Sequence, residues 1–106
     1  MEEMTDDKHF LLTYELSSDY LDRRGGYRAE HLGLAQLYAS DGRLVLGGAL
    51  VDPADKAVLI FKCPDDSDVR AFVQADPYVT NGLVTSWSIR EWMTVVGDEA
   101  AWSVIV

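Results

Sequence analysis

The stretch Lys56–Cys63, which reads KAVLIFKC, is the most strongly strand-like run of the chain. Its middle is apolar on both faces, which is typical of a strand inside a sheet. A turn at 52–55 precedes it, and the acidic segment 64–68, PDDSD, follows it. Asp65 is a plausible N-cap there, because early acidic residues suit the helix dipole. We therefore expect a central strand that leads directly into a helix.

Outside this unit, alternating apolar residues predict strands, and apolar residues at helical spacing predict helices. In order, we expect a strand at 9–16, a helix at 27–40, a strand at 43–51, the strand at 56–63, a helix from 65 to about 76, and a strand at 83–93. Residues 17–26 carry turn residues and are expected to form a loop. The order β-α-β-β-α-β favours an α+β ferredoxin-like sandwich with an antiparallel sheet.

Both helices would cover one face of this sheet, which leaves the other face without a partner. Its strands would place apolar residues there beside polar ones: Leu11, Val58, Ile60 and Trp92. Such a face is too apolar to remain in water, so we expect a homodimer through it. Alternatively, the C-terminal tail, residues 94–106, folds over it, adds a short strand or extends the dimer contact.

Composition and charge limit the classes of partner. A chain of 106 residues suits one domain, and its net charge of −9 argues against nucleic acid and against an anionic membrane surface. Cys63 is the only cysteine, which fits a reducing compartment and a buried thiol. Residues 1–7 read as an acidic disordered leader without the features of a signal peptide, and no apolar run reaches bilayer length. We expect a cytoplasmic location.

His31 and Asp76 are the residues best suited to chemistry. Imidazole titrates near neutral pH and can take and return a proton, and a neighbouring carboxylate would fix its tautomer. Asp76 lies where a helix should end, because Pro77 disfavours helical backbone at the residue before it. An anion is disfavoured at that end of a helix. Asp76 is either a turn residue that caps backbone amides or a partner of His31, and spacing alone cannot place the two side chains together.

Other candidates would bind rather than react. Arg28 precedes His31 by one helical turn and could hold a substrate carboxylate, or it could pair with acidic neighbours together with Arg23 and Arg24. Tyr78 could line a pocket or belong to the core. Gly48 permits close approach of a ligand or of a helix. We expect no metal and no cofactor, because two histidines and one cysteine cannot supply a zinc-type ligand set, and no dinucleotide or P-loop motif occurs.

Together these motifs resemble the YciI-like (YCII-related) family. The resemblance rests on Arg28-x-x-His31-Leu32, on Asp41-Gly42 before a Gly47-Gly48 strand, and on Asp76-Pro77-Tyr78, and it covers about residues 8–93. It implies a dimeric α+β barrel built from ferredoxin-like protomers, with a cleft that holds a His-Asp dyad. His31 matches the family histidine and Asp76 the family aspartate. Gly48-Ala49 departs from the Gly-Pro of many members, and the tail at 94–106 is additional.

The leading functional hypothesis is a cofactor-independent small-molecule enzyme of the isomerase, lyase or dehalogenase type. His31 would act as base and then as acid, Asp76 would orient it, and Arg28, Tyr78 and Gly48 would contact a small anionic or ring-containing substrate. The alternative is a non-catalytic dimeric module that binds a ligand or a protein. Haem ligation by His31 is a third reading that nothing else in the sequence requires.

Overall fold

The protein is described here by a computed structural model that covers residues 7–102. Positions 1–6 and 103–106, which hold most of the predicted leader and the end of the predicted tail, lie outside the described residues. In the described part, no helix is long and apolar enough to cross a membrane.

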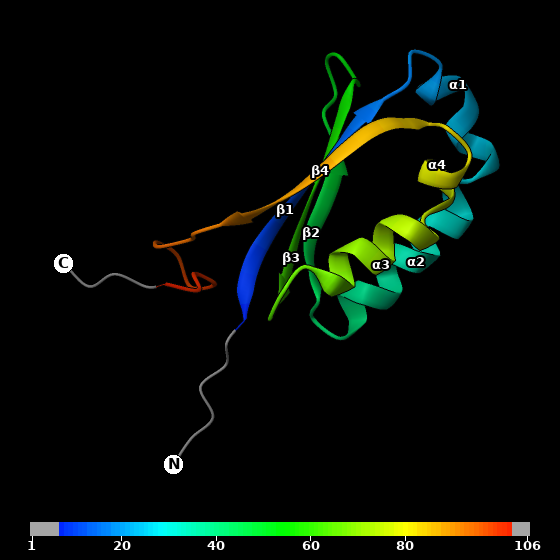
Figure 1. Cartoon of the computed structure of the whole chain (residues 1–106). Helices are drawn as coiled ribbons and strands as arrows, with labels where there is room; N and C mark the ends of the chain where they lie inside the picture. Colours follow the sequence, from blue (N-terminus) through cyan, green and yellow to red (C-terminus); the bar gives the residue numbers. More distant parts are fainter. Residues whose placement is uncertain (1–6, 103–106) are drawn as a thin grey trace.

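Four antiparallel strands form one sheet in the order β2-β3-β1-β4 (Figure 1). Their bounds are β1 Lys8–Leu16, β2 Leu44–Ala49, β3 Lys56–Cys63 and β4 Val84–Trp92. The four predicted strands and the antiparallel sheet are confirmed, and KAVLIFKC lies inside the sheet between β1 and β2, as expected for a central strand. This is the expected ferredoxin-like arrangement.

The helical segments all lie on one side of the sheet (Figure 1). They are α1 Tyr20–Arg23, the 3-10 helix η1 Arg24–Gly26, α2 Arg28–Ser40, α3 Ser67–Ala75 and α4 Pro77–Thr80. The predicted helices at 27–40 and 65–76 correspond to α2 and α3. Gly42, with a φ of 86°, lets the chain leave α2 in a left-handed conformation that other residues rarely adopt.

Three details of the sequence prediction are wrong. The segment 17–26 is not simply a loop, because α1 and η1 form within it. The N-cap of α3 is Asp66, while the side chain of Asp65 accepts a hydrogen bond from the Ser67 amide. The chain does not merely turn after α3, since Pro77 starts α4. Proline fits there because the first amides of a helix have no intrahelical acceptor.

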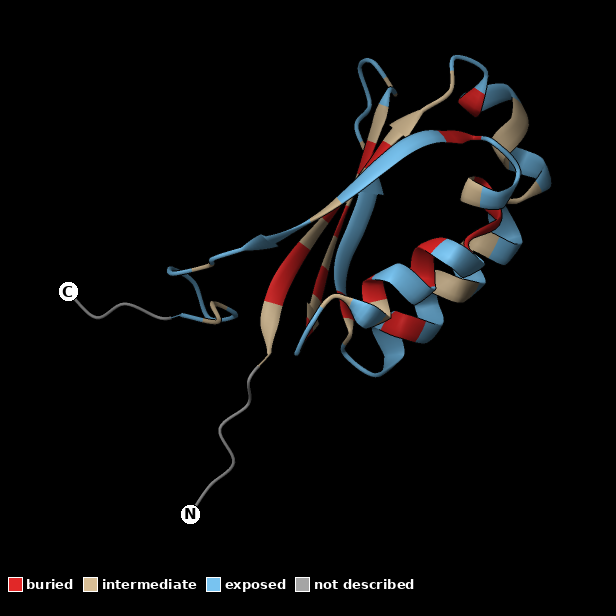
Figure 2. Ribbon diagram, viewed as in Figure 1, coloured by how far each residue is buried: buried red, intermediate tan, exposed pale blue. Residues whose placement is uncertain are grey.

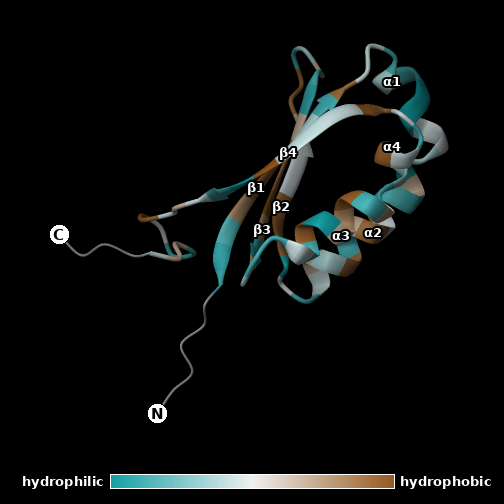
Figure 3. Ribbon diagram, in the orientation of Figure 1, coloured by the Kyte–Doolittle hydropathy of each residue, from teal (hydrophilic) through white to brown (hydrophobic). Residues whose placement is uncertain are grey.

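The core lies between the sheet and the helices, as Figures 2 and 3 show for the middle of β1 and β3 and the inner side of α3. Alternate residues of β1 and β3 face it, and α3 adds three buried side chains: Phe10, Leu12, Tyr14, Ala57, Leu59, Phe61, Cys63, Val69, Phe72 and Val73. Cys63 is buried, as expected, and this burial raises the pKa of its thiol to about 11. The period of two in β1 and β3 thus becomes one continuous apolar layer.

The opposite face of the sheet keeps apolar side chains at its surface. Leu46 is 69% and Trp92 48% exposed, while Leu11, Val58 and Ile60 are half-buried. Much of β4 is exposed as well (Figure 2). Trp87, which the alternation of β4 places on the core side opposite Tyr14, remains 40% exposed because β4 is an edge strand.

The first part of the tail folds back against β1. His9, 3% exposed, contacts the Thr94 hydroxyl through Nδ1 at 2.7 Å. The same hydroxyl oxygen accepts a hydrogen bond from the Ala101 amide, and Glu99 lies 3.7 Å from Lys62. Residues 94–102 consist of turns and irregular backbone. Burial lowers the pKa of His9, Lys62 lowers it further, and Glu99 and Asp7 oppose the change.

This environment predicts a pH dependence of stability. Because the pKa of His9 is lowered on folding from 6.5, the unfolded chain binds the proton more readily, so the free energy of unfolding should fall as pH drops below about 6.5. Urea denaturation between pH 5 and pH 8 measures this change, and His9→Gln should remove part of it. An NMR titration of His9 that gave a pKa at or above the ordinary value would contradict the prediction.

Candidate functional site

The site forms where the first turn of α2 meets the junction of α3 and α4. His31 projects from α2, and Asp76 occupies the single extended position between the two later helices. Its φ of −73° and ψ of 119° are the extended backbone expected before Pro77. His31 Nδ1 lies 2.8 Å from Asp76 Oδ1. The two residues that sequence spacing could not join are therefore in direct hydrogen-bond contact.

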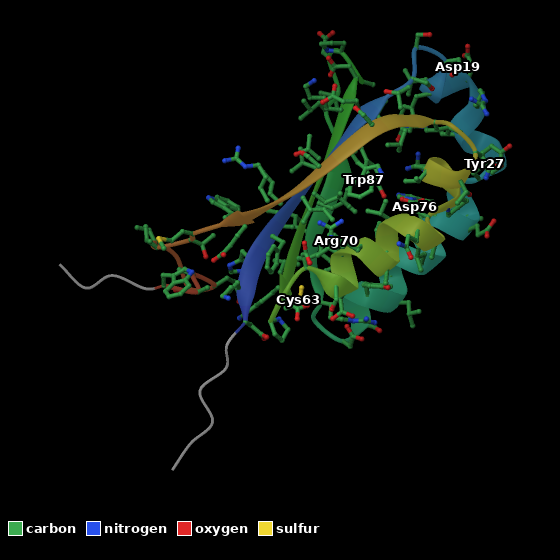
Figure 4. All side chains as sticks on the ribbon, in the orientation of Figure 1. Asp19, Tyr27, Cys63, Arg70, Asp76 and Trp87 are labelled. Carbon is green, nitrogen blue, oxygen red and sulfur yellow. The ribbon has the colours of Figure 1, made fainter. Side chains whose placement is uncertain are left out.

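Asp76 is fully buried, with 0% exposure, and both of its carboxyl oxygens are occupied. The Tyr14 hydroxyl donates to Oδ2 at 2.7 Å, and the Tyr78 amide donates to Oδ1 at 3.0 Å. Asp76 therefore caps the first turn of α4 as well as contacting His31. Both readings of this residue made from the sequence hold in the structure. Figure 4 labels Asp76 among the side chains of the helical layer.

These contacts define the tautomer of His31. A carboxylate accepts hydrogen bonds and donates none, and Asp76 already accepts from Tyr14 and Tyr78. His31 Nδ1 then carries the proton that it donates to Oδ1. In the neutral ring, Nε2 is left as a hydrogen-bond acceptor, and it has no hydrogen-bond partner among residues 7–102.

Aromatic rings fix the plane of the imidazole. The ring of Tyr78 stacks on His31, with centroids 3.9 Å apart and an interplanar angle of 6°. Tyr20 meets Tyr78 edge to face at 5.7 Å, and Phe72 meets His31 edge to face at 6.4 Å. The imidazole is thus held both by a hydrogen bond and by its faces, which limits its rotation.

A cavity of about 250 Å³ lies beside His31, between α2 and the inner face of the sheet. His31, Arg28, Tyr78 and Gly48 all line it, and Asp76 lies behind them. The rest of the lining is mostly aliphatic or aromatic: Tyr14, Tyr20, Arg24, Leu32, Ala35, Leu44, Gly47, Ala49, Ala57 and Leu59. The candidate binding residues therefore share one cavity with the candidate histidine.

Gly47 and Gly48 differ in how much space surrounds them. A Cβ at Gly47 would lie 3.1 Å from Leu59 Cγ, so close packing between β2 and β3 favours glycine there. A Cβ at Gly48 would meet nothing within 4 Å. The packing explanation therefore applies to Gly47, whereas Gly48, which pairs with Val58, lines the cavity through its backbone and has no packing neighbour that requires a glycine.

Tyr14 is a site residue that the sequence analysis did not single out. It reaches both the cavity and Asp76 from β1. Burial, the neighbouring carboxylate of Asp76 and the hydrogen bond to it raise the pKa of Tyr14 far above its usual range, so its hydroxyl keeps the proton that it donates. The sequence did contain a signal for this role. Tyr14 lies on the apolar face of its strand, and a buried phenol needs a hydrogen-bond partner.

Among residues 7–102, no three His, Cys, Asp or Glu side chains are grouped so that they could hold an ion.

A comparison with known protein families shows which family this chain belongs to. The model of the YCII-related domain matches residues 8–93. The chain belongs to the YCII-related family. No curated protein matches the sequence of this YCII-related chain.

Solved structures similar to this YCII-related chain support the fold. One is 5-chloro-2-hydroxyhydroquinone dehydrochlorinase (TftG) from Burkholderia phenoliruptrix AC1100 in complex with 2,5-dihydroxybenzoquinone; it is 20% identical, with a TM-score of 0.69 over 81% of this chain and 94% of TftG. A putative antibiotic biosynthesis monooxygenase from Bacteriodes thetaiotaomicron VPI-5482 is 10% identical, with a TM-score of 0.56 over 87% and 92% of the two chains. A nipsnap family protein from Agrobacterium tumefaciens str. C58 is 15% identical, with a TM-score of 0.54 over 86% and 90%.

The hydrogen bond between Tyr14 and Asp76 predicts a measurable loss of stability. Tyr14→Phe would leave Oδ2 of a buried carboxyl group without its donor, which should lower the free energy of unfolding by about 1–3 kcal/mol. Urea denaturation measures the change. Tyr38→Phe is the matched control, because Tyr38 is also buried and its hydroxyl makes no hydrogen bond within residues 7–102. Equal losses in the two variants would contradict a special role for the Tyr14 hydroxyl.

Proposed function

We propose that this chain is a small-molecule enzyme in which His31 acts as a general base and then as a general acid, without a cofactor. The observation that carries the proposal is the hydrogen bond between His31 Nδ1 and a fully buried Asp76 at the wall of a cavity. A histidine oriented by a carboxylate, with its second nitrogen unbonded, is the arrangement that proton transfer requires.

Each residue of the site has a role in this mechanism. Nε2 of His31 takes a proton from the bound substrate and returns it to a second atom. Asp76 keeps the proton on Nδ1 and stabilises the imidazolium that forms, while Tyr14 and the Tyr78 amide hold the carboxylate in place. Arg28, Tyr78 and the backbone at Gly48 would contact the substrate in the cavity.

The reaction class that we propose is isomerisation, elimination or dehalogenation of a small ring compound. The relative TftG is a dehydrochlorinase whose structure contains a dihydroxybenzoquinone. In an elimination of this type, His31 would remove the proton while chloride leaves from the ring, so that the net change is loss of HCl. The alternative, a ligand-binding module without turnover, would use the same cavity but would not need a histidine with an unbonded Nε2.

Substitution of the His31–Asp76 pair tests the mechanism. Screening should begin with chlorinated hydroxyhydroquinones, with chloride release as the readout, and continue with other small hydroxylated rings. Once turnover is found, we expect His31→Ala and Asp76→Asn each to lower kcat/KM by roughly 10²- to 10⁴-fold, because the base or its orientation is lost. Since the two residues act as a unit, the double variant should lose little more than either single one.

His9→Gln provides the matched control, because His9 lies on the opposite face of the sheet and contacts Thr94. It should keep full activity near pH 7.5. Turnover that survives His31→Ala would eliminate the mechanism, and binding of ring compounds without any turnover would favour the module.

We also propose that two chains associate through the outer face of the sheet. This face carries exposed or half-buried apolar residues, and it is hollowed at two places, beside Trp92 and beside Leu46. Side chains from a second copy could fill such hollows, and covering exposed apolar side chains favours association. The cavity beside His31 lies on the other face, and it shares Gly47, Gly48 and Ala49 of β2 with the hollow beside Leu46.

A pair of matched substitutions tests the dimer. Leu46→Glu introduces a charge into the outer face, whereas Leu37→Glu introduces it at a leucine on α2 that is 59% exposed. Light scattering after gel filtration should give twice the chain mass for the native protein and for Leu37→Glu, and a shift toward the single-chain mass for Leu46→Glu. A native protein of single-chain mass would rule the dimer out.

A further inference from the structure

We propose that Arg24 and Arg28 form an anion clamp at the cavity and that its ligand is a small single ring bearing a carboxylate. This arginine clamp names the substrate class of the site described above and therefore rests on the proposed function. Arg28 was a candidate from the sequence, whereas Arg24 is placed at the cavity by the structure.

The arginine clamp consists of two cations that no carboxylate of residues 7–102 neutralises. Of the other seven Lys and Arg residues, Lys8 and Arg90 do not line the cavity, and five are paired with acidic residues: Arg23, Arg43, Lys56, Lys62 and Arg70. Within residues 7–102, neither Arg24 nor Arg28 makes an ion pair, although the chain holds 18 acidic residues against 9 basic ones. Surface pairing, the alternative left open by the sequence, therefore applies to Arg23 and not to these two.

The helix dipole does not favour Arg28 at its position. Arg28 is the first residue of α2, where the helix dipole disfavours a cation. Arg24 lies over the ring of Tyr20, with its guanidinium carbon 5.6 Å from the ring centroid. This contact orients one guanidinium beside the cavity in advance, which lowers the entropy lost on binding an anion.

The positive charge of Arg24 and Arg28 acts on Tyr78, the ring that stacks on His31. Burial and Tyr20 raise the pKa of the Tyr78 phenol, while Arg28 and Arg24 oppose that rise. Because the Tyr78 ring stacks on His31, an anion held by the arginine clamp would lie near the candidate base. A ligand with its charged group at the arginines could thus present its ring toward Nε2.

Cavity size and lining indicate what the rest of the ligand is. A volume of about 250 Å³ lies just below the roughly 300–1,000 Å³ of sites that enclose drug-sized molecules, which suits a ligand built on a single ring. Leu32, Leu44 and Leu59 offer apolar walls for that ring. A carboxylate suits the charged end, because its two oxygens match the fork of a guanidinium, and the net charge of −9 disfavours anions elsewhere on the chain.

Isothermal titration calorimetry with two matched ligands tests the arginine clamp on the native full chain. The ligands are 2,5-dihydroxybenzoate and its neutral analogue 2,5-dihydroxybenzamide. We expect the carboxylate to bind at least tenfold more tightly at low salt and to lose this advantage at high salt. Arg24→Gln and Arg28→Gln should each raise the Kd of the carboxylate by about tenfold and leave that of the amide nearly unchanged. Arg24→Lys should recover part of the loss.

Arg70→Gln is the charge-matched control, because Arg70 pairs with Asp66 on α3 and does not line the cavity. It should leave both affinities unchanged, and circular dichroism should show the native fold for every variant. Equal binding of the two ligands, no saturable binding of the carboxylate, or an effect of Arg28→Gln alone would overturn the two-arginine clamp.

Failure of the proposed function would give a different result, since this experiment measures binding and not turnover. If carboxylate binding depends on both arginines while His31→Ala leaves turnover unchanged, the arginine clamp stands and the acid–base mechanism falls. If turnover depends on His31 while carboxylate and amide bind alike, the mechanism stands and the arginine clamp falls.

Discussion

The buried carboxyl group of Asp76 is the constraint on which the rest of this structure depends. A polar group with no exposure is costly unless every oxygen is satisfied, and here the donors come from three separate elements: Tyr14 on β1, His31 on α2 and the Tyr78 amide on α4. The same hydrogen bonds therefore tie the helices to the sheet and orient the imidazole. Stability and the proposed chemistry share one set of contacts, so substitutions at this point should affect both.

Sequence patterns predicted the fold because they report which face of an element is buried. The apolar run in KAVLIFKC and the alternation in β1 were sufficient for the central strands, and the Asp76-Pro77 pair predicted the extended backbone at the end of α3. The contact of His31 with Asp76 could not be derived, because it depends on how two helices tilt on the sheet. The missed helix α4 had a local signal, since an aspartate followed by proline is a typical N-cap and first helical residue.

The helix dipole also explains why the sequence made Asp76 seem misplaced. Taken as the end of α3 alone, a carboxylate there is unfavourable. Taken as the N-cap of α4, it accepts the Tyr78 amide and is favourable. The exposure of Trp87 has a similar explanation. Alternation along β4 shows which face of the sheet its side chain lies on, but not whether another element covers that face at the edge strand. In both cases the missing information was the neighbouring element.

The cavity walls and the hydrogen-bond donors belong to largely different parts of the chain. β2 and β3 supply Leu44, Ala57 and Leu59 to the walls but no donor to Asp76. Mutations in these two strands can therefore change the size of the cavity without disturbing the carboxylate. Over evolutionary time, such a division would let a lineage change the shape of the cavity while it keeps the hydrogen bonds that hold Asp76 and His31 together.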